Sequence, residues 1–185
     1  MPDSPDQHVS ESVLISRVVA HDDHEAFARL VRLHQSAVRQ FLRRLTGNDW
    51  SRADDLAQET FWKAYRHIGS FRARGRFLSW LFRIAFQLFI TEQRRRRVLV
   101  QLPMPDEVRE AGDAGRQFVD ARTFDQLMDM LRPEERAAIV LCYRHELTHT
   151  EIAETLDLPV GTVKSLIRRA RLRLQEALGS REVDR

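Results

Sequence analysis

One stretch organises the second half of this chain: residues 148–167, which read THTEIAETLDLPVGTVKSLI. Ile152 and Leu156 lie on the inner face of one predicted helix, where small Ala153 permits a close crossing. Asp157 follows this helix, and an aspartate side chain suits a tight turn at that position. The inner face of the next predicted helix comprises Val163, Leu166, Ile167, Ala170 and Leu174. Two helices in this arrangement are typical of a helix-turn-helix.

The outward side of the second predicted helix carries hydrogen-bond donors: Thr162, Lys164, Ser165, Arg168 and Arg169. Residues 161–175 include five basic side chains and no acidic one. A recognition helix presents such donors to base edges and phosphates in the major groove. The alternative is a helical hairpin whose arginines are merely solvated. That alternative does not explain why the spacing, the apolar inner face and the distribution of charge all fit a helix-turn-helix. We therefore predict that this segment binds duplex DNA.

Helical periodicity also precedes this pair of helices. The apolar positions are Phe124, Leu127, Met128 and Leu131. Pro133 then suits the first position of a helix that runs through Tyr143. Prolines and glycines interrupt residues 98–122, which we interpret as a flexible linker. A linker of about 25 residues can span roughly 80 Å, enough for its flanking domains to touch DNA sites more than one turn apart.

Three amphipathic helices are predicted in the first half of the chain. The first follows the apolar residues within 27–45, and Ser51 suits the cap of the second, with Asp54 in a capping box. The third covers residues 77 to about 97. Alternating strand patterns are absent, so we predict an all-α fold of two small helical domains joined by the linker. Domains of this size are individually marginal in stability, which favours a larger partner.

Cations alternate with aromatic side chains in residues 71–80, FRARGRFLSW. The candidate residues for binding single-stranded nucleic acid are Phe71, Arg72, Arg74, Arg76 and Trp80. Aromatic faces stack on unpaired bases while arginines hold the backbone. Phe77, Trp80 and Leu81 also stand at helical spacing, which by itself favours a role in the hydrophobic core.

Acidic and amide side chains gather at the start of the second predicted helix: Asp54, Asp55, Gln58 and Glu59. Acids in a first turn interact favourably with the helix dipole, which is the simpler explanation of the cluster when it is taken alone.

Composition excludes several classes of protein. The net charge of +3 is too small for a general polyanion binder, so the positions of the charges matter more than their sum. Cys142 is the single cysteine and suits a reducing cytosol. The N-terminus has no signal-peptide pattern, and the apolar run at 77–90 carries a polar stripe. We expect a cytoplasmic protein that does not span a membrane.

Two pairs of histidines have spacings compatible with one helical face: His21 with His24, and His145 with His149. Two histidines alone do not complete a zinc site, so we predict no bound metal. The sequence also contains no catalytic constellation. We expect neither an enzyme nor a cofactor.

Four motifs follow one another in a fixed order. They are DDLAQETF at 54–61, SFR at 70–72, WLFRIA at 80–85, and GTVKS at 161–165 with RRAR at 168–171. In order and spacing they resemble the extracytoplasmic-function (ECF) sigma factors of the sigma-70 family. The resemblance divides the chain into an N-terminal extension (1–24), region two (25–97), the linker (98–122), region four (123–178) and a C-terminal tail (179–185).

The resemblance implies a factor that binds core RNA polymerase and directs promoter-specific transcription initiation. Asp54, Asp55, Gln58 and Glu59 would dock on the clamp helices of the largest polymerase subunit. The turn from Phe71 to Arg76, and the following helix with Trp80 and Gln87, would capture and melt the minus-ten element and hold a flipped base. The recognition helix of region four would read the minus-thirty-five element. Catalysis would belong to the polymerase.

Several positions depart from the family pattern. Gln87 replaces a usual asparagine, Thr91 a usual aspartate, and Leu166 an arginine. Arg52 stands where the acidic signature normally begins, next to Ser51. We hypothesise that phosphorylation of Ser51 by a protein kinase adds about −1.5 to −2 charges beside an under-charged docking surface. The simpler alternative is that Ser51 caps the helix.

Two other questions stay open at the level of sequence. A stand-alone helix-turn-helix regulator that binds duplex DNA without polymerase is the alternative function, although it explains only residues 123–178. Whether an anti-sigma factor or a kinase regulates the protein is not encoded in these motifs.

Overall fold

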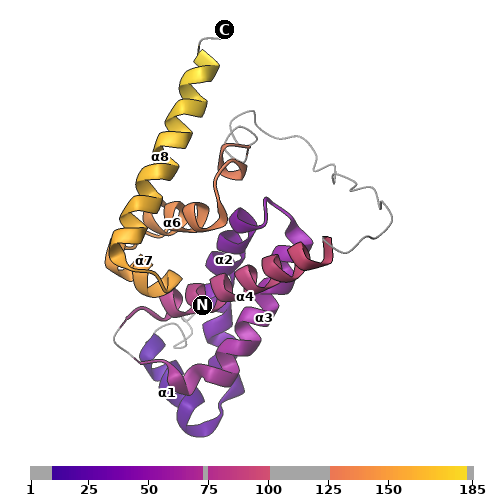
Figure 1. Cartoon of the computed structure of the whole chain (residues 1–185). Helices are drawn as coiled ribbons and strands as arrows, with labels where there is room; N and C mark the ends of the chain where they lie inside the picture. The colour runs from indigo at the N-terminus through magenta and orange to yellow at the C-terminus, as the bar shows by residue number, and fades with distance from the viewer. Residues whose placement is uncertain (1–9, 73–74, 101–125, 183–185) are drawn as a thin grey trace, which may run out of the picture.

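The computed structural model describes residues 10–72, 75–100 and 126–182, and within them the regular elements are all helices (Figure 1). This agrees with the predicted all-α fold. The first part, which we call the N-terminal bundle, contains α1 (Glu11–His21), α2 (His24–Leu45), α3 (Trp50–His67), a 3-10 turn (Ile68–Ser70) and α4 (Phe77–Val100). The second part, the C-terminal domain, contains a helical turn at 126–129, α6 (Pro133–Tyr143), α7 (His149–Leu156) and α8 (Val160–Glu182).

Helix α1 was not predicted, because its segment was treated as an extension ahead of the folded domain. Leu14 and Val18 are buried and pack α1 against α2. The two helices meet at a sharp corner, where Asp22 adopts a left-handed conformation (φ 51°). Asp23 then caps α2 by accepting a hydrogen bond from the Ala26 amide at 2.9 Å. The bundle therefore begins about fifteen residues earlier than its sequence pattern indicated.

The cap of α3 differs from the prediction. Asp49, not Ser51, is the N-cap, and its carboxylate accepts a hydrogen bond from the Arg52 amide at 3.0 Å. Ser51 lies inside the first turn with its side chain exposed, so the predicted capping box between Ser51 and Asp54 is wrong. Aspartate and serine are equally good caps, and the chain geometry after the Gly47 turn decides between them.

Helix α4 packs one apolar face into the core of the bundle. Its buried side chains are Phe77, Leu81, Phe82, Ala85, Phe86, Leu88 and Phe89. Helices α2 and α3 pack against it with their own apolar stripes. Among the described residues, no helix is long and apolar enough to cross a membrane.

The C-terminal domain has the predicted helix-turn-helix. Thr148 and Glu151 form a capping box that starts α7, and Asp157 ends it in a left-handed conformation (φ 57°). The inner face of α8 is buried at Val163, Leu166, Ile167 and Ala170, as its spacing predicted. Cys142 is half-buried at the end of α6, and burial raises the pKa of its thiol.

The two parts of the chain pack against each other, with α7 on α4 and α6 on α2. Arg136 of α6 is buried and donates hydrogen bonds to the carbonyls of Arg44 and Leu45 at the end of α2, at 3.2 and 3.4 Å. Asp129 pairs with Arg136 at 3.0 Å. A Cβ atom on Gly47 would stand 3.2 Å from the Asp129 carboxylate, so this approach favours glycine. The predicted linker lies almost wholly outside the described residues, apart from its first positions, which belong to α4.

Candidate nucleic-acid interface

The outward face of α8 carries the donors predicted for duplex DNA. Thr162, Lys164, Ser165, Arg168 and Arg169 are all exposed. The Ser165 hydroxyl donates a hydrogen bond to the Gly161 carbonyl at 3.0 Å within the helix. Figure 1 shows α8 extending away from the rest of the molecule over much of its length. The donors lie at the N-terminal end of α8, beside α7, which is the end that a recognition helix presents to base edges in a major groove.

Two positions of α8 behave differently from the rest of this face. Leu166 is 6% exposed and belongs to the core, as its place on the inner face predicted. Arg169 is 51% exposed along its side chain, yet its Nε atom lies 3.4 Å from Glu135 of α6. Arg173, one turn further on, also pairs with Glu135. Arg169 is therefore shared between the solvent-facing side and a buried carboxylate.

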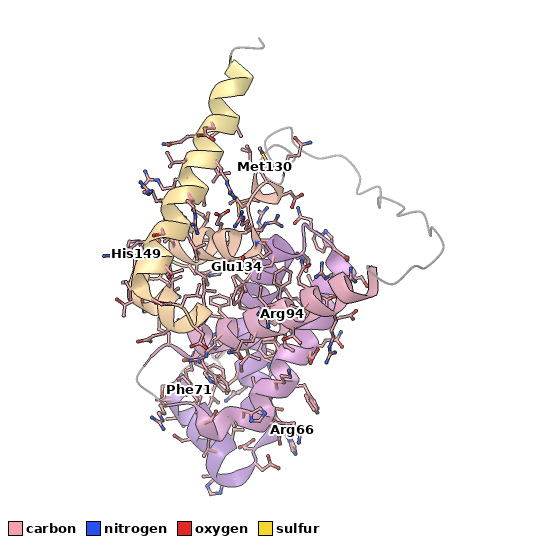
Figure 2. All side chains as sticks on the ribbon, viewed as in Figure 1. Arg66, Phe71, Arg94, Met130, Glu134 and His149 are labelled. Atoms are coloured by element: carbon pink, nitrogen blue, oxygen red, sulfur yellow. The ribbon has the colours of Figure 1, made fainter. Side chains whose placement is uncertain are left out.

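The basic and aromatic turn between α3 and α4 forms a second surface, and Figure 2 labels Phe71 within it. Phe71, Phe77 and Trp80 pack as three mutually contacting rings, with centroids 5.3 to 5.6 Å apart. Phe77 is 1% exposed and is a core residue, whereas Phe71 and Trp80 are only half-buried. Arg72 and Arg76 are exposed, and Arg74 lies outside the described residues. The aromatic faces available to a base thus belong to Phe71 and Trp80.

A cavity of about 730 Å³ separates this turn from α7. Phe71, Arg72, Arg76 and Trp80 are among the residues that line it from the turn and α4. From α7 the lining residues are Glu151, Glu154 and Thr155. Hydrogen bonds from Thr148, above all from its backbone amide, lower the pKa of the Glu151 carboxyl, and the charge of Arg76 lowers it further. Carboxylates of one domain therefore face the arginines that were predicted to hold DNA.

Arg83 of α4 connects the same two surfaces. Its guanidinium lies 3.4 Å from the Asp157 carboxylate, with side-chain exposures of 42% and 72%. An ion pair this exposed contributes little stability. Gln87 and Thr91, on the exposed side of α4, continue the polar stripe, and the Thr91 hydroxyl donates to the Gln87 carbonyl.

The acidic side of α3 is a separate exposed surface. Asp55, Gln58 and Glu59 are exposed, and Asp54 is half-buried against Arg39 of α2 at 3.3 Å. The opposite side of α3 is buried at Ala53, Leu56, Ala57 and Thr60. Because the acidic residues lie on the outside of the bundle, they are accessible to a partner protein.

Arg52 does not belong to that acidic surface. Its guanidinium makes a two-point ion pair with Glu92 of α4, with Nε to oxygen distances of 3.0 and 2.8 Å. The Arg52 side chain is only 12% exposed. Glu92 also pairs with Arg96 at 2.9 Å. The basic residue that departs from the family pattern is thus neutralised between α3 and α4 rather than displayed beside Asp55.

His145, in the turn after α6, lies at the contact between the two parts of the chain. Its ring centroid is 4.4 Å from that of Phe82, which is fully buried. The His145 Nε2 atom is buried and makes no hydrogen bond within the described residues. Burial, together with Arg144 and Arg76, lowers the pKa of His145 to about 4. The imidazole is therefore neutral at pH 7.

An apolar groove of about 790 Å³ runs between α2, α6 and α8. Its exposed apolar residues are Trp50, Tyr143 and Leu178. Its basic residues are Arg43, Arg44, Arg144 and Arg171. The Arg43 guanidinium lies 3.3 Å from the centroid of the Trp50 ring. The groove thus combines an apolar floor with several cations.

The sequence did not single out Arg83, Glu135, Arg136 or the Trp50 groove as functional. Arg83 appeared only as a member of the WLFRIA motif and of the polar stripe within 77–90, and the sequence analysis assigned no role to Glu135. Their partners come from segments distant in the sequence, and helical periodicity carries no information about such contacts. Among the described residues there is no group of three or more side chains that could hold a metal ion.

Comparison with known proteins gives the family of the chain. The family descriptions Sigma-70 region 2 and Sigma-70, region 4 match residues 30–98 and 121–174. The ECF RNA polymerase sigma factor SigW of Bacillus subtilis is 33% identical over 181 residues, which cover 86% of this chain and 92% of SigW. The chain belongs to the ECF sigma factors of the sigma-70 family.

Other sigma factors show the same likeness. The ECF sigma factor SigE of Mycolicibacterium smegmatis is 36% identical over 162 residues, covering 80% of this chain and 60% of that longer relative. The sigma factor RpoE of Bartonella quintana, solved in complex with the anti-sigma factor NepR, has a TM-score of 0.73 and 30% identity, covering 87% of this chain and 99% of that chain.

The ECF sigma factor is thus a transcription initiation factor that acts with RNA polymerase and promoter DNA. Both conserved regions are present, so the N-terminal bundle carries region two and the C-terminal domain carries region four. The alternative of a stand-alone helix-turn-helix regulator is set aside, because it leaves the match over residues 30–98 unexplained.

Proposed function

We propose that three surfaces of this sigma factor divide the work of initiation. The acidic side of α3 docks on the clamp helices of the largest polymerase subunit. The turn before α4 captures and melts the minus-ten element, and α8 reads the minus-thirty-five element. One observation supports this division most strongly. The three sets of side chains lie on different exposed surfaces, and the helices that carry them bury their opposite faces.

The docking role rests on Asp54, Asp55, Gln58 and Glu59. Three of the four are exposed, and Arg39 holds Asp54 by an ion pair. An acidic helix face attracts a basic partner surface and contributes to the rate of association. We expect an Asp55→Lys variant with Glu59→Lys to lose co-migration with core polymerase.

The melting role rests on Phe71, Arg72, Arg76, Trp80 and Gln87, together with Arg74, which lies outside the described residues. Stacking of one base on an aromatic ring contributes about 1–3 kcal/mol. We expect Trp80→Ala to retain polymerase binding and to lose transcription from duplex promoters. Activity of this variant should return on a template in which the minus-ten region is already mismatched.

Run-off transcription tests the proposed function as a whole. Core polymerase is incubated with a fragmented bacterial genomic library, with and without the protein. Discrete new start sites that share upstream sequence are the expected result. If the protein neither co-migrates with core polymerase nor generates start sites, yet shifts duplex DNA, the proposal is wrong.

Regulation by phosphorylation remains a proposal for Ser51. Asp49 provides the helix cap, which leaves the Ser51 hydroxyl exposed in the first turn of α3. A phosphate there would interact favourably with the helix N-terminus and add charge beside Asp55. Arg52 would not neutralise it, because Arg52 is engaged by Glu92.

The Ser51 proposal predicts that Ser51→Glu binds core polymerase more tightly than Ser51→Ala. A Ser16→Glu change on the exposed side of α1 adds the same charge away from α3 and serves as the control. Equal affinities of the two Ser51 variants for core polymerase would contradict the proposal.

Regulation by an anti-sigma factor is the second possibility that we propose. The similar RpoE was solved with such a partner. The groove with Trp50, Tyr143 and Leu178 has an apolar floor, and its arginines complement an acidic amphipathic segment. We expect Trp50→Asp to weaken such a complex while leaving transcription with core polymerase intact. A peptide library of acidic amphipathic helices, read by binding to this variant and to the unmodified protein, measures the effect.

A further inference from the structure

Glu135 is a fully buried carboxylate in the first turn of α6, with a side chain 1% exposed. Its Oε1 atom lies 3.4 Å from Nε of Arg169, an ion pair without a hydrogen bond to that oxygen among the described residues. Its Oε2 atom lies 2.5 Å from Nη1 of Arg173, which donates a hydrogen bond to it. Oε2 also accepts a hydrogen bond from the Arg132 amide at 3.2 Å. Both arginines belong to α8, the predicted recognition helix, whereas Glu135 lies outside the helix-turn-helix.

A carboxylate buried to this degree requires charged or hydrogen-bonding partners, since an unpaired buried charge is strongly destabilising. Both cationic partners of Glu135 come from one helix, four residues apart on one face. Rotation of α8 about its axis, or a shift along it, would separate the carboxylate from both arginines. The interaction therefore fixes α8 against α6 more sharply than apolar packing, which is not directional.

We propose that Glu135 is a positioning residue for promoter recognition, because it holds Arg169 and Arg173 and so sets the orientation of α8 on duplex DNA. The inference rests on the proposed role of α8 in reading the minus-thirty-five element. The residues left to contact DNA directly are Thr162, Lys164, Ser165 and Arg168. Arg169 acts through its ion pair with Glu135 and does not contact bases independently.

Loss of the carboxylate has opposite effects on specific and non-specific binding. Glu135→Gln releases two guanidinium groups next to the DNA-facing side of α8, and each free cation adds a phosphate contact. Each added contact steepens the dependence of log affinity on log salt by about 0.9, so the slope steepens by up to about 2. The helix orientation is loosened at the same time, so discrimination between sequences falls.

The experiment uses holoenzyme formed from core polymerase and the full chain. Its two probes are a promoter fragment selected by the unmodified holoenzyme and the same fragment with the upstream element shuffled. We expect Glu135→Gln to bind the shuffled fragment more tightly and to reduce the ratio of the two affinities by about tenfold. Glu134→Gln, which removes the same charge one residue away, is the matched control and should leave the ratio unchanged.

A double-mutant cycle distinguishes positioning from a merely structural role. Glu135→Gln combined with Arg169→Ala should change the ratio no more than Glu135→Gln alone, because Arg169 acts through Glu135. Glu135→Gln combined with Arg168→Ala should show additive changes. Additivity in both cycles would overturn the proposal, as would a Glu135→Gln variant that weakens binding to both fragments equally.

Two further outcomes are separated by the design. If Glu135→Gln fails to fold, Arg173→Met replaces it in the double-mutant cycle with Arg169→Ala. Arg173→Met removes one cationic partner of Glu135 and keeps an aliphatic side chain at that position. Additive changes in that cycle also contradict the proposal. If unmodified holoenzyme shows no preference between the two fragments, the role proposed for α8 is wrong, and that result is distinct from a normal preference that Glu135→Gln leaves untouched.

Discussion

At the scale of single residues, the environment of a side chain outweighs its type. Arg52 and Arg168 are both arginines on helices with a functional assignment, yet one is 12% exposed in an ion pair with Glu92 and the other faces solvent. His145 carries no charge at pH 7 because it is buried beside Phe82. In both examples, burial and neighbouring charges decide what the side chain contributes to binding or to stability.

The depressed pKa of His145 makes stability depend on pH. Neutral His145 is favoured in the folded state, so its contribution is fully present above the ordinary histidine pKa of 6.5 and is lost as pH falls from 6.5 towards 4. Between pH 7 and pH 5 the free energy of unfolding should drop by about 2 kcal/mol on this account. Urea unfolding at the two pH values measures the drop, and His145→Gln should remove most of it. The same substitution at exposed His67 should not.

The cap of α3 gives a second prediction at this scale. Asp49→Ala removes the acceptor of the Arg52 amide and should destabilise the protein by about 1 kcal/mol. Ser51→Ala should change the free energy of unfolding by less than about 0.5 kcal/mol. Thermal unfolding compares the two variants. A larger effect at Ser51 than at Asp49 would show that the cap is misassigned.

At the scale of elements, α1 matters because it closes one side of the bundle. Its contribution comes from two buried side chains, Leu14 and Val18, which face α2. Neighbouring Val13 and Val19 are about half exposed, so the apolar pattern of this segment does not by itself indicate which face is buried.

We expect Leu14→Ala to destabilise the sigma factor by about 2–5 kcal/mol, as for other buried leucines. Val13→Ala, on the exposed side of the same helix, is the control and should have little effect. Chemical denaturation measures both. If the two substitutions have equal effects, α1 does not pack on α2 as described.

At the scale of the whole molecule, the two conserved regions form one continuous hydrophobic core. Buried Arg136 satisfies carbonyls at the end of α2, and His145 packs on Phe82. The Arg83–Asp157 ion pair adds little, because both partners are exposed. In this arrangement Glu151 and Glu154 of α7 line the same cavity as the turn proposed to melt promoter DNA.

Cleavage between the two regions tests their packing. A protease site introduced at residue 112 would cut the chain between the N-terminal bundle and the C-terminal domain. We expect the two fragments to co-elute on gel filtration at pH 7, and Arg136→Ala to separate them. Separation of the unmodified fragments would contradict the interface described here.

The order and spacing of four motifs indicated the two sigma-70 regions by resemblance. The sequence alone also determined the all-α class, the inner face of α8 and the tight turn at Asp157. Each of these depends on spacing within a single segment, where helical geometry directly relates sequence to burial. Only the tertiary structure decided that α1 belongs to the bundle, that Asp49 caps α3, that Arg52 pairs with Glu92 and that Arg169 is shared with Glu135. These outcomes depend on which distant groups meet, and short-range periodicity does not specify the partners of a buried charge or of a helix face.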